Sequence, residues 1–364
     1  MSTRRVTIED VARRAGVSTA TVSRTVNGTA CVADGTLKRV REAIDELGFR
    51  PTPAAQNLRQ RRTRNIALVT PTMLNPFFPE LVAGVHPELQ ARGYSLLVID
   101  TEEPEREAVR AADSRIVDGV LLVASSGEAK QPLQMPWDVP MVAIDRTPSM
   151  LEIDVVQCDN EAGARDVMRH LIGCGHTRIA HIRGPARLDV ATQRARGYLD
   201  GLAFHGVPFD DRLVITGNFD EDSGFAAASA LLTAPRPPTA IFAANDLMAI
   251  GAIAAAHQHG LRVPDDVAVA GFDGIHLGRY TQPALTTFVQ PFAALAQKAA
   301  KLLVDAIDRR DSQAFRRPAT TLTQLPGRLI VRGSTVISVP PARGQHPGHG
   351  SPTRQSDPTP AGAL

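Results

Sequence analysis

The sequence has few cysteines, no long apolar run and no export signal, and each absence excludes a class of protein. Its three cysteines, Cys31, Cys158 and Cys174, are odd in number and form no CxxC pair, which excludes a disulfide framework and a zinc knuckle. The longest apolar runs, such as residues 120–124, are far too short to cross a bilayer. The N-terminus lacks the apolar stretch of a secretion signal, so we expect a cytoplasmic protein with no membrane partner.

Several signatures of enzymes are also missing. The chain has no GxSxG, no Walker A loop, no HExxH and no GxGxxG after a strand, and no motif pairs a nucleophile with a base. His257 and His259 are two residues apart on a predicted helix, and side chains at that spacing do not share a helical face. We therefore expect a protein that is not an enzyme and that needs no metal or other cofactor.

The charge of the chain is unevenly distributed. The composition, with 43% hydrophobic and 21% charged residues, is that of a soluble globular protein, and 364 residues suggest two or three domains. The net charge is only +2, but residues 1–64 hold 13 Lys and Arg against 6 Asp and Glu, whereas the remainder holds 27 against 32. A basic head on a mildly acidic body indicates that the head binds a polyanion, unless its charges form only a solvated face.

The basic head opens with the pattern of a helix-turn-helix. Thr7 precedes a first turn that carries Asp10, which is close to a capping box and predicts a helix that begins at residue 8. Gly16 can adopt the left-handed conformation that ends this helix, and Ser18 can cap a second helix over residues 19–26. A third helix is predicted over residues 34–47, ending at Gly48.

The second predicted helix is the one that would enter the DNA major groove. Val22 and Val26 lie one turn apart on one face, and the other face presents Thr19, Ala20, Ser23 and Arg24. A helical hairpin without DNA-binding function can also use glycine at its corner, so this spacing alone leaves both interpretations open.

A short basic segment follows the head. Thr52 can cap a helix whose first residue is Pro53, and four arginines follow between residues 59 and 64. Such a helix has barely two turns and should order only when something packs against it. It is either a coupling element between the head and the body or a plain interdomain linker.

The head contains four recognisable motifs, which are VTIEDVARRAGVS at residues 6–18, TVSR at 21–24, NG at 27–28 and ELGFRP at 46–51. Together they closely resemble the motifs of the lactose-repressor (LacI/GalR) family of bacterial transcription regulators. The resemblance implies a homodimer on a pseudo-palindromic operator, with phosphate contacts in the head and two hinge helices in the minor groove. The residues that it assigns to DNA are Thr7, Ser18, Thr19, Ala20, Thr21, Ser23, Arg24, Asn27, Ala55, Gln56 and Leu58.

Within that set, Arg24 is expected to contact a guanine, Thr19 a thymine methyl group, and Ala20 to give apolar contact at best. Leu58 is expected to be the side chain that wedges between base pairs.

The chain also departs from the family pattern. Thr52 and Gln56 replace the usual Asn and the frequent Arg of the hinge. The third helix has Ala33 and Leu37 where Ser and Arg are usual, and we expect Asp34 to act as its cap instead.

The rest of the chain alternates apolar strands with helices. Strands are predicted at residues 66–69, 96–99, 120–123, 142–144, 179–182, 240–243 and 267–270, with helices between them at, for example, 80–93 and 161–173. This alternation predicts parallel sheets covered on both faces, and a break near residues 159–160 suggests two similar lobes. Composition and periodicity alone do not choose this fold over other doubly wound folds.

The resemblance continues to about residue 335 and implies a specific architecture. We expect an all-α helix-turn-helix head and an α/β two-lobed body like that of periplasmic binding proteins. The expected domains are a head at 1–50, a hinge helix and linker at 51–64, a body at 65–338 and a disordered tail at 339–364, which is rich in Pro, Gly, Ser and His. The N-lobe is expected at about 65–160 and 291–322, and the C-lobe at about 161–290 and 323–338.

A ligand site is expected beyond the carboxyl ends of the strands, between the lobes. Carboxylates, amides and guanidinium groups around aromatic rings suit a sugar, whose hydroxyl groups need both donors and acceptors. Each residue also has a structural alternative, because an Asp after a strand often caps a helix and a Phe is often core. The residues that match the family's effector positions are Phe77, Phe78, Asp145, Arg146, Arg194, Phe219, Asn245, Asp273 and Gln290. Leu188 stands where purine-responsive members carry Arg, which makes a purine a less suitable ligand.

These features together predict a DNA-binding repressor that a sugar-like effector controls. The tail has no leucine heptad of the kind with which family members tetramerise, so we expect a dimer. The alternative is a cytoplasmic sugar-binding or sugar-modifying protein without sequence-specific DNA function. The sequence leaves open the effector, the operator, the regulated genes and whether the effector releases DNA or promotes binding.

Overall fold

The computed structural model describes residues 6–27, 32–49, 62–125, 139–149, 151–310 and 320–336. Three of the expected DNA contacts, Ala55, Gln56 and Leu58, lie outside these ranges, as does the tail at 339–364, so the hinge helix and the disordered tail stay predictions. Among the helices described, none combines the length and the apolar character needed to cross a membrane.

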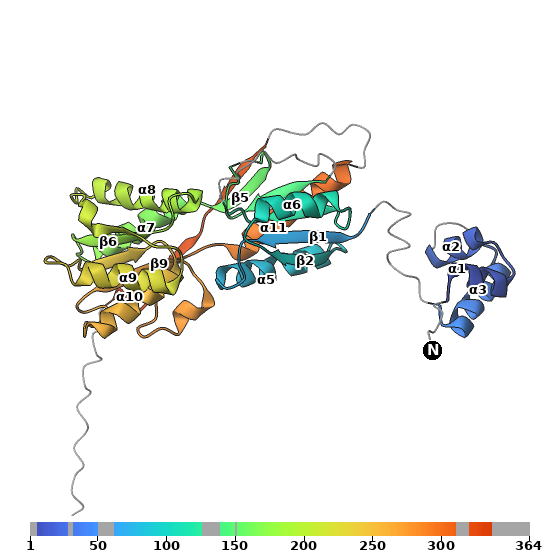
Figure 1. Cartoon of the computed structure of the whole chain (residues 1–364), viewed down its shortest axis with the longest axis horizontal. Coiled ribbons are helices and arrows are strands. Elements are labelled where there is room, and N and C mark those ends of the chain that lie inside the picture. The colour runs from blue at the N-terminus through green and yellow to red at the C-terminus, as the bar shows by residue number, and fades with distance from the viewer. Residues whose placement is uncertain are drawn as a thin grey trace, which may run out of the picture.

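The head consists of three helices whose limits follow local capping chemistry (Figure 1). They are α1 (Ile8–Ala15), α2 (Thr19–Asn27) and α3 (Asp34–Leu47). Thr7 and Asp10 form the predicted capping box, and Gly16 ends α1 in the left-handed conformation, with φ of 63°. Gly48 ends α3 in the same way. The predicted helix limits of the head are therefore confirmed to within one residue.

A small apolar core joins the three helices. It is built from Val11, Ala12, Ala15, Val22, Val40 and Ala43. The expected cap of α3 is wrong, because Asp34 is the first residue of the helix and Ala33 occupies the cap position without a side-chain hydrogen bond. Asp34 instead places a carboxylate in the first turn, where it interacts favourably with the helix dipole.

The body contains two six-stranded sheets. The first has the spatial order β11 (Leu322–Leu325), β5 (Asp154–Cys158), β4 (Met141–Ile144), β3 (Gly119–Leu122), β1 (Asn65–Thr70), β2 (Ser95–Asp100). The second has the order β12 (Arg328–Ile330), β10 (Thr286–Val289), β9 (Ala268–Asp273), β8 (Ala240–Ala243), β6 (Ile179–Arg183), β7 (Val214–Thr216). Every pair is parallel except β10 with β12.

Helices cover both faces of each sheet, as the apolar strands require. The first sheet carries α5 (Phe77–Gln90), α6 (Pro104–Asp113) and α11 (Phe292–Arg310), and the second carries α7 (Asn160–Gly173), α8 (Asp189–Phe204), α9 (Glu221–Leu232) and α10 (Asp246–Gln258). Separate apolar cores lie on the two faces of each sheet. All seven predicted strands are present, so the predicted doubly wound body is confirmed.

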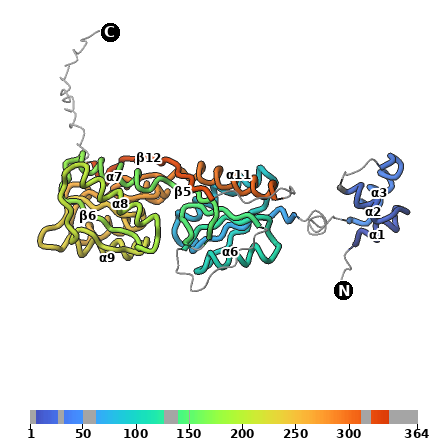
Figure 2. Tube along the Cα trace, turned by 90° about the horizontal axis from the view of Figure 1, so that it is seen from above, coloured from blue at the N-terminus to red at the C-terminus, as the bar shows by residue number. Residues whose placement is uncertain are grey.

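The chain passes between the two lobes three times (Figure 2). It crosses after β5, after β10 and between β11 and β12. The last crossing comes after Leu325 rather than at the expected boundary near residue 322, because β11 pairs with β5 of the first sheet. These three crossing segments connect the lobes and can act as a hinge. The carboxyl ends of the strands in both sheets face the region between the lobes.

A candidate effector cleft and DNA-reading helix

One face of α2 is exposed and carries the expected base-reading residues. Thr19, Ala20 and Arg24 are all exposed, whereas Val22 on the opposite face is fully buried in the core of the head. The Ser18 hydroxyl accepts a hydrogen bond from the Thr21 backbone N–H at 3.1 Å, which fixes the first turn of α2. The helix therefore offers short side chains and one long cation to an external surface, as a major-groove helix does.

The residues of the head that were expected to contact phosphate differ in their exposure and in their hydrogen bonds. Thr7 is exposed, although its hydroxyl already donates to the Asp10 carboxylate at 2.9 Å. The Ser18 and Thr21 hydroxyl groups lie 2.9 Å apart and bond to each other. Ser23 is only 8% exposed and does not share the open face of Thr19 and Arg24, contrary to the expected arrangement. The side chain of Asn27 lies outside the described residues.

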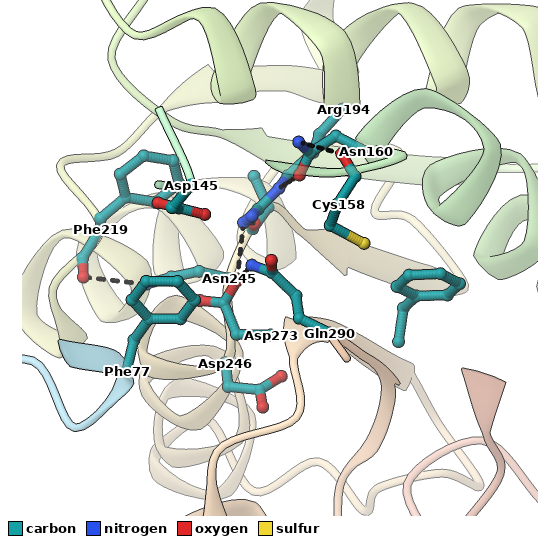
Figure 3. Close-up of polar contacts among 12 residues, drawn as sticks. Phe77, Asp145, Cys158, Asn160, Arg194, Phe219, Asn245, Asp246, Asp273 and Gln290 are labelled. Atoms are coloured by element: carbon teal, nitrogen blue, oxygen red, sulfur yellow. Dashed lines mark hydrogen bonds and ion pairs between the residues drawn. The ribbon is translucent and has the colours of Figure 1, made fainter. Parts of the chain in front are cut away.

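A pocket lies between the lobes, where residues from both meet. The side chains that line it are Asn75, Phe77, Asp145, Arg146, Val190, Arg194, Phe219, Asn245 and Asp273. Seven of them were expected from the family resemblance. Asn75 and Val190 were not, although Asn75 lies two residues before Phe77, in the loop that follows β1. Figure 3 shows Asp145, Arg194 and Asp273 converging beside the rings of Phe77 and Phe219.

Arg194 is the centre of the polar network. Its guanidinium group lies 3.0 Å from the Asp273 carboxylate, donates to Asn160 Oδ1 at 2.9 Å and donates to the backbone oxygen of Ala244 at 2.6 Å. It also stacks on the Phe272 ring, 3.9 Å from the ring centroid. A buried charge with this many partners is held in one orientation, which places Asp273 at the pocket wall.

Asp145 and Arg146 form a second buried pair. Their charged atoms lie 3.4 Å apart, and the Arg146 guanidinium group lies 5.3 Å from the centroid of the Phe78 ring. Burial raises the pKa of Asp145 to about 6, although Arg146 and Arg194 act to lower it. Asp145 Oδ1 has no hydrogen-bond partner among the described residues, so one oxygen of this carboxylate is available to a ligand hydroxyl group.

Two of the predicted site residues have other positions. Phe78 is buried in the core of the first lobe beneath Arg146 and does not line the pocket, so its expected role as a stacking face is wrong. Gln290 also lies behind the pocket wall. It donates to Asp273 Oδ1 at 2.9 Å, and its own amide oxygen has no partner among the described residues.

Asn245 lines the pocket, but its polar atoms are used by the protein. Its side-chain oxygen caps α10 by accepting from the Met248 N–H at 3.0 Å, and its amide donates to the backbone oxygen of Phe219 at 3.0 Å. Phe219 has a φ of 66°, a left-handed conformation that is unusual for a bulky residue. Asn245 therefore positions the Phe219 ring, a role that differs from the expected direct contact with the effector.

Backbone strain is concentrated at this site. Asp145, Phe219 and Asp273 all have positive φ, with values of 71°, 66° and 108°. Asp246 supports the last of these turns, because its buried carboxylate accepts from the N–H groups of Gly274 and Ile275, both at 2.8 Å. Burial and the nearby Asp273 raise the pKa of Asp246 well above its usual value. Residues held in strained conformations by their surroundings are typical of binding sites.

The pocket is narrow, because contacts across the cleft hold the lobes together. The Glu80 carboxylate of α5 accepts from the backbone N–H of His276 in the second lobe at 2.7 Å, and the Asp189 carboxylate of α8 accepts from the Thr147 N–H of the first lobe at 3.2 Å. The free space inside is about 10 Å³, enough for about one water molecule. A ligand with the size of a sugar therefore requires the lobes to move apart.

The described residues offer no metal site. Among them, no group of three or more His, Cys, Asp or Glu side chains has the arrangement of metal ligands. The cysteine nearest the cleft, Cys158, is buried, and burial raises the pKa of its thiol to about 12. The site is thus a set of paired charges, amides and rings suited to non-covalent binding.

Two family models match the chain. Residues 7–52 match the bacterial regulatory proteins of the lacI family, and residues 168–335 match the periplasmic binding protein-like domain. A curated relative, the HTH-type transcriptional repressor PurR of Vibrio campbellii, is 35% identical over 312 residues, which are 84% of this chain and 93% of PurR.

Solved structures with the same architecture cover nearly the whole chain. A complex of the transcriptional regulator CelR with cellobiose is 35% identical, with a TM-score of 0.66, and the match covers 91% of this chain and all of that one. A Lac repressor dimer bound to operator and the anti-inducer ONPF is 28% identical, with a TM-score of 0.77, and the match covers 92% of this chain and all of that one. With its head, its two-lobed body and this extent of identity, the chain belongs to the lacI family of bacterial regulatory proteins.

Proposed function

We propose that the protein is a transcriptional repressor that binds a pseudo-palindromic operator as a homodimer and is controlled by a neutral, sugar-like effector. The observation that carries the proposal is that one chain combines an exposed helix-turn-helix face with a buried polar cleft between two hinged lobes. The relative named PurR is a transcriptional repressor, and the related Lac repressor dimer has been solved on operator DNA.

In the head, we assign base contacts to α2 and phosphate contacts to its neighbours. Arg24 is the long exposed side chain of the reading face and suits bidentate contact with a guanine, while Thr19 and Ala20 suit apolar contact with a thymine methyl group. Thr7, Ser18 and Thr21 present hydroxyl groups near helix starts, where phosphate oxygens bind well. Asn27, Ala55, Gln56 and Leu58 remain proposed contacts from the family resemblance.

The charges of the cleft favour an uncharged effector. Arg146 is paired with Asp145 and Arg194 with Asp273, so neither guanidinium group is free to neutralise a phosphate. Asp189 adds a further carboxylate to the electrostatic surroundings of Asp145. A neutral hydroxyl group can donate to Asp145 Oδ1, whereas an anion meets only guanidinium groups that are already paired.

The apolar walls of the cleft suit a sugar ring. The rings of Phe77 and Phe219 flank the polar groups, an arrangement that packs on the C–H faces of a pyranose or furanose. Leu188 is buried against Val190 and Phe219 and offers no hydrogen bond to a purine base. The related CelR structure contains cellobiose, which agrees with this class of ligand.

The proposed dimer surface includes apolar side chains that the single chain leaves exposed. On edge strand β2 of the first lobe, Leu97 and Val98 are 37% and 41% exposed, contrary to the expectation that this strand is buried on both faces. Leu74 of the same lobe and Leu277 and Tyr280 of the second lobe are also exposed. A second copy of the chain, as in the related Lac repressor dimer, would cover such a surface.

The same assignment implies a protein without enzymatic activity, because it would bind DNA and not alter it. It also implies a cytoplasmic protein, because that is where its DNA would be. A sugar-binding or sugar-modifying protein without DNA function is the alternative. It would explain the cleft, but it gives no role to the exposed face of α2.

Selection of duplex DNA by the purified full-length protein tests the DNA-binding half of the proposal. We expect enrichment of a pseudo-palindrome, with half-sites arranged for a dimer. If no sequence is enriched, with or without a pool of sugars and nucleosides, the repressor proposal fails and the alternative is favoured.

Calorimetric titration tests the effector half. Neutral sugars and nucleosides are compared with their phosphate esters, and we expect each phosphate ester of a bound compound to bind at least about tenfold more weakly, because both guanidinium groups of the cleft are already paired with carboxylates. The Asp145→Asn variant should reduce that discrimination by removing one of the carboxylates. Equal affinity for a sugar and its phosphate would contradict the proposed neutral effector.

A further inference from the structure

A buried carboxylate holds the point at which the chain enters the body from the head. Asp118 precedes β3 and is almost fully buried. Its Oδ1 accepts from the Thr63 N–H at 2.6 Å and from the Thr63 hydroxyl at 2.9 Å, and its Oδ2 accepts from the Arg64 N–H at 2.9 Å. One side chain thus binds two consecutive backbone groups immediately before β1.

The bound segment, residues 62–64, has a conformation that needs this support. Arg64 has a φ of 57°, a left-handed conformation that costs a non-glycine residue on the order of 1 kcal/mol. Its guanidinium group lies over the ring of buried Tyr94, 5.3 Å from the centroid. Arg62 adds a second attachment through an ion pair of 3.0 Å with Asp308 of α11. Segment 62–64 is therefore fixed to the first lobe in one direction.

Strands β1 and β3 extend from the contact between Asp118 and residues 62–64 to the cleft. Asp118 and segment 62–64 lie at the amino ends of β3 and β1, and the chain leaves the carboxyl end of β1 toward Asn75 and Phe77 of the pocket. Figure 1 shows β1 running from the end of the first lobe at which the strand begins toward the second lobe. A rigid parallel sheet, about 20 Å along its strands, thus connects the effector site with the end of the linker at residues 62–64.

We propose that Asp118 is a positioning residue for operator binding, which fixes where and in which direction the chain leaves the body for the head. This inference rests on the proposed repressor function. A dimer must hold two heads at the spacing of two half-sites, and a loosened exit from each body widens the range of spacings that the heads sample. Non-specific DNA binding depends on the charges of each head and needs no fixed spacing.

The chain offers a matched control for this carboxylate. Asp154 is the first residue of β5 in the same sheet, so it also lies at the amino end of a strand. Its Oδ1 accepts from the N–H and the hydroxyl of Thr321 at 2.8 and 2.7 Å. The two sites share one feature, a carboxylate oxygen that accepts from both the N–H and the hydroxyl of a threonine before a strand. The bound threonine precedes β11, however, and has no direct connection to the head.

The test compares Asp118→Asn and Asp154→Asn with the unaltered protein. Each full-length protein is titrated onto the duplex that the unaltered protein selects and onto an unrelated duplex, by fluorescence anisotropy at one salt concentration. We expect Asp118→Asn to bind the selected duplex about tenfold more weakly, because an amide NH₂ then faces one of the two backbone N–H groups that the carboxylate had accepted from. Its affinity for the unrelated duplex and both affinities of Asp154→Asn should stay within about twofold of the unaltered protein.

A second, milder variant tests the same contact in case Asp118→Asn does not fold. Thr63→Val keeps the branched shape but removes one of the three donors to Asp118, and it should weaken operator binding by about threefold in the same selective way. Unchanged operator affinity in both variants overturns the proposal, and so does an equal loss in Asp154→Asn. If the unaltered protein selects no duplex, the repressor function itself fails, and that result is distinct from either of these.

Discussion

Replacement of Arg194 by methionine tests the buried network of the cleft. Methionine has a similar length but no charge, so Arg194→Met removes the 3.0 Å ion pair with Asp273 and the hydrogen bonds to Asn160 and to the Ala244 carbonyl. Asp273 stays buried, with Gln290 as a remaining donor. Loss of one partner of a buried pair leaves an uncompensated charge, so we expect a loss of about 3–5 kcal/mol in unfolding free energy.

The charge of Asp273 gives this prediction a dependence on pH. Burial already raises the pKa of Asp273, and Arg194 acts to lower it. Without Arg194 the pKa rises further, so the folded protein binds a proton more tightly than the unfolded chain. Stability lost by Arg194→Met should therefore return as pH falls through the folded-state pKa, at up to about 1.4 kcal/mol per pH unit. Asp273→Asn in the same chain should recover part of the loss even at high pH.

The measurement is urea unfolding followed by circular dichroism at pH 8 and pH 5.5, for the unaltered protein, the two single variants and the double variant. We expect a coupling free energy of about 1–3 kcal/mol between Arg194 and Asp273 at pH 8, and less at pH 5.5. Arg165→Met is the control, because Arg165 forms exposed ion pairs with Glu161 and Asp200 and its loss should cost less than about 1 kcal/mol. A variant Arg194→Met as stable as the unaltered protein, or equally destabilised at both pH values, would refute the reasoning.

Three further predictions concern the head, the second lobe and the dimer. Arg24→Ala should lose about 1–3 kcal/mol of discrimination at one base pair of the selected operator, and an unchanged base preference would remove Arg24 as a reader. His181 is buried between the rings of Tyr198 and Phe242, and burial lowers its pKa to about 4. Because the unfolded chain takes up this proton first, stability falls as pH drops from about 6.5 toward 4, and His181→Phe should show a shallower fall in urea midpoint; parallel curves would refute this. Leu97→Glu should shift sedimentation equilibrium toward monomer, and an unaltered dimer would place the interface elsewhere.

The head could be predicted from sequence because its determinants are local. The capping box of Thr7 and the left-handed glycines Gly16 and Gly48 each act within one turn of a helix end, and they set the limits of α1 and α3 as expected. The cap of α3 was wrong because Asp34 and Ala33 are both compatible with a helix start. Which of the two residues is the N-cap depends on the direction from which the preceding chain approaches the helix. The identity of a single residue does not determine that direction.

The cleft was predictable in outline, because parallel strands bring their carboxyl ends to one edge. The roles of single residues were less so, since they depend on contacts between distant segments. Phe78 follows Phe77 on a helix, and consecutive residues of a helix point in different directions, so only Phe77 lines the pocket. Asn245 has the spacing of a ligand contact, yet its polar atoms serve a helix cap and the Phe219 carbonyl.

The strands missed by the sequence analysis share a physical cause. Five strands were not predicted. β7 and β12 are three residues long, β10 contains two buried threonines, and polar residues interrupt β5 and β11, so none has an apolar run longer than two residues. Their stability comes from neighbours in the sheet rather than from their own pattern. Conversely, the apolar strand β2 is exposed because it lies at an edge, which supports the proposed covering by a second copy of the chain.

The central claim is that the cleft controls the head, and it is tested most directly by one comparison. The affinity of the full-length protein for its selected duplex is measured with and without a saturating concentration of the neutral compound that calorimetry identifies. A repressor of this kind should show affinities that differ by a factor of about 5 to 150, the usual range of allosteric coupling. Identical affinities with the cleft empty and saturated would contradict the account, because a ligand that binds both states of the dimer equally shifts neither.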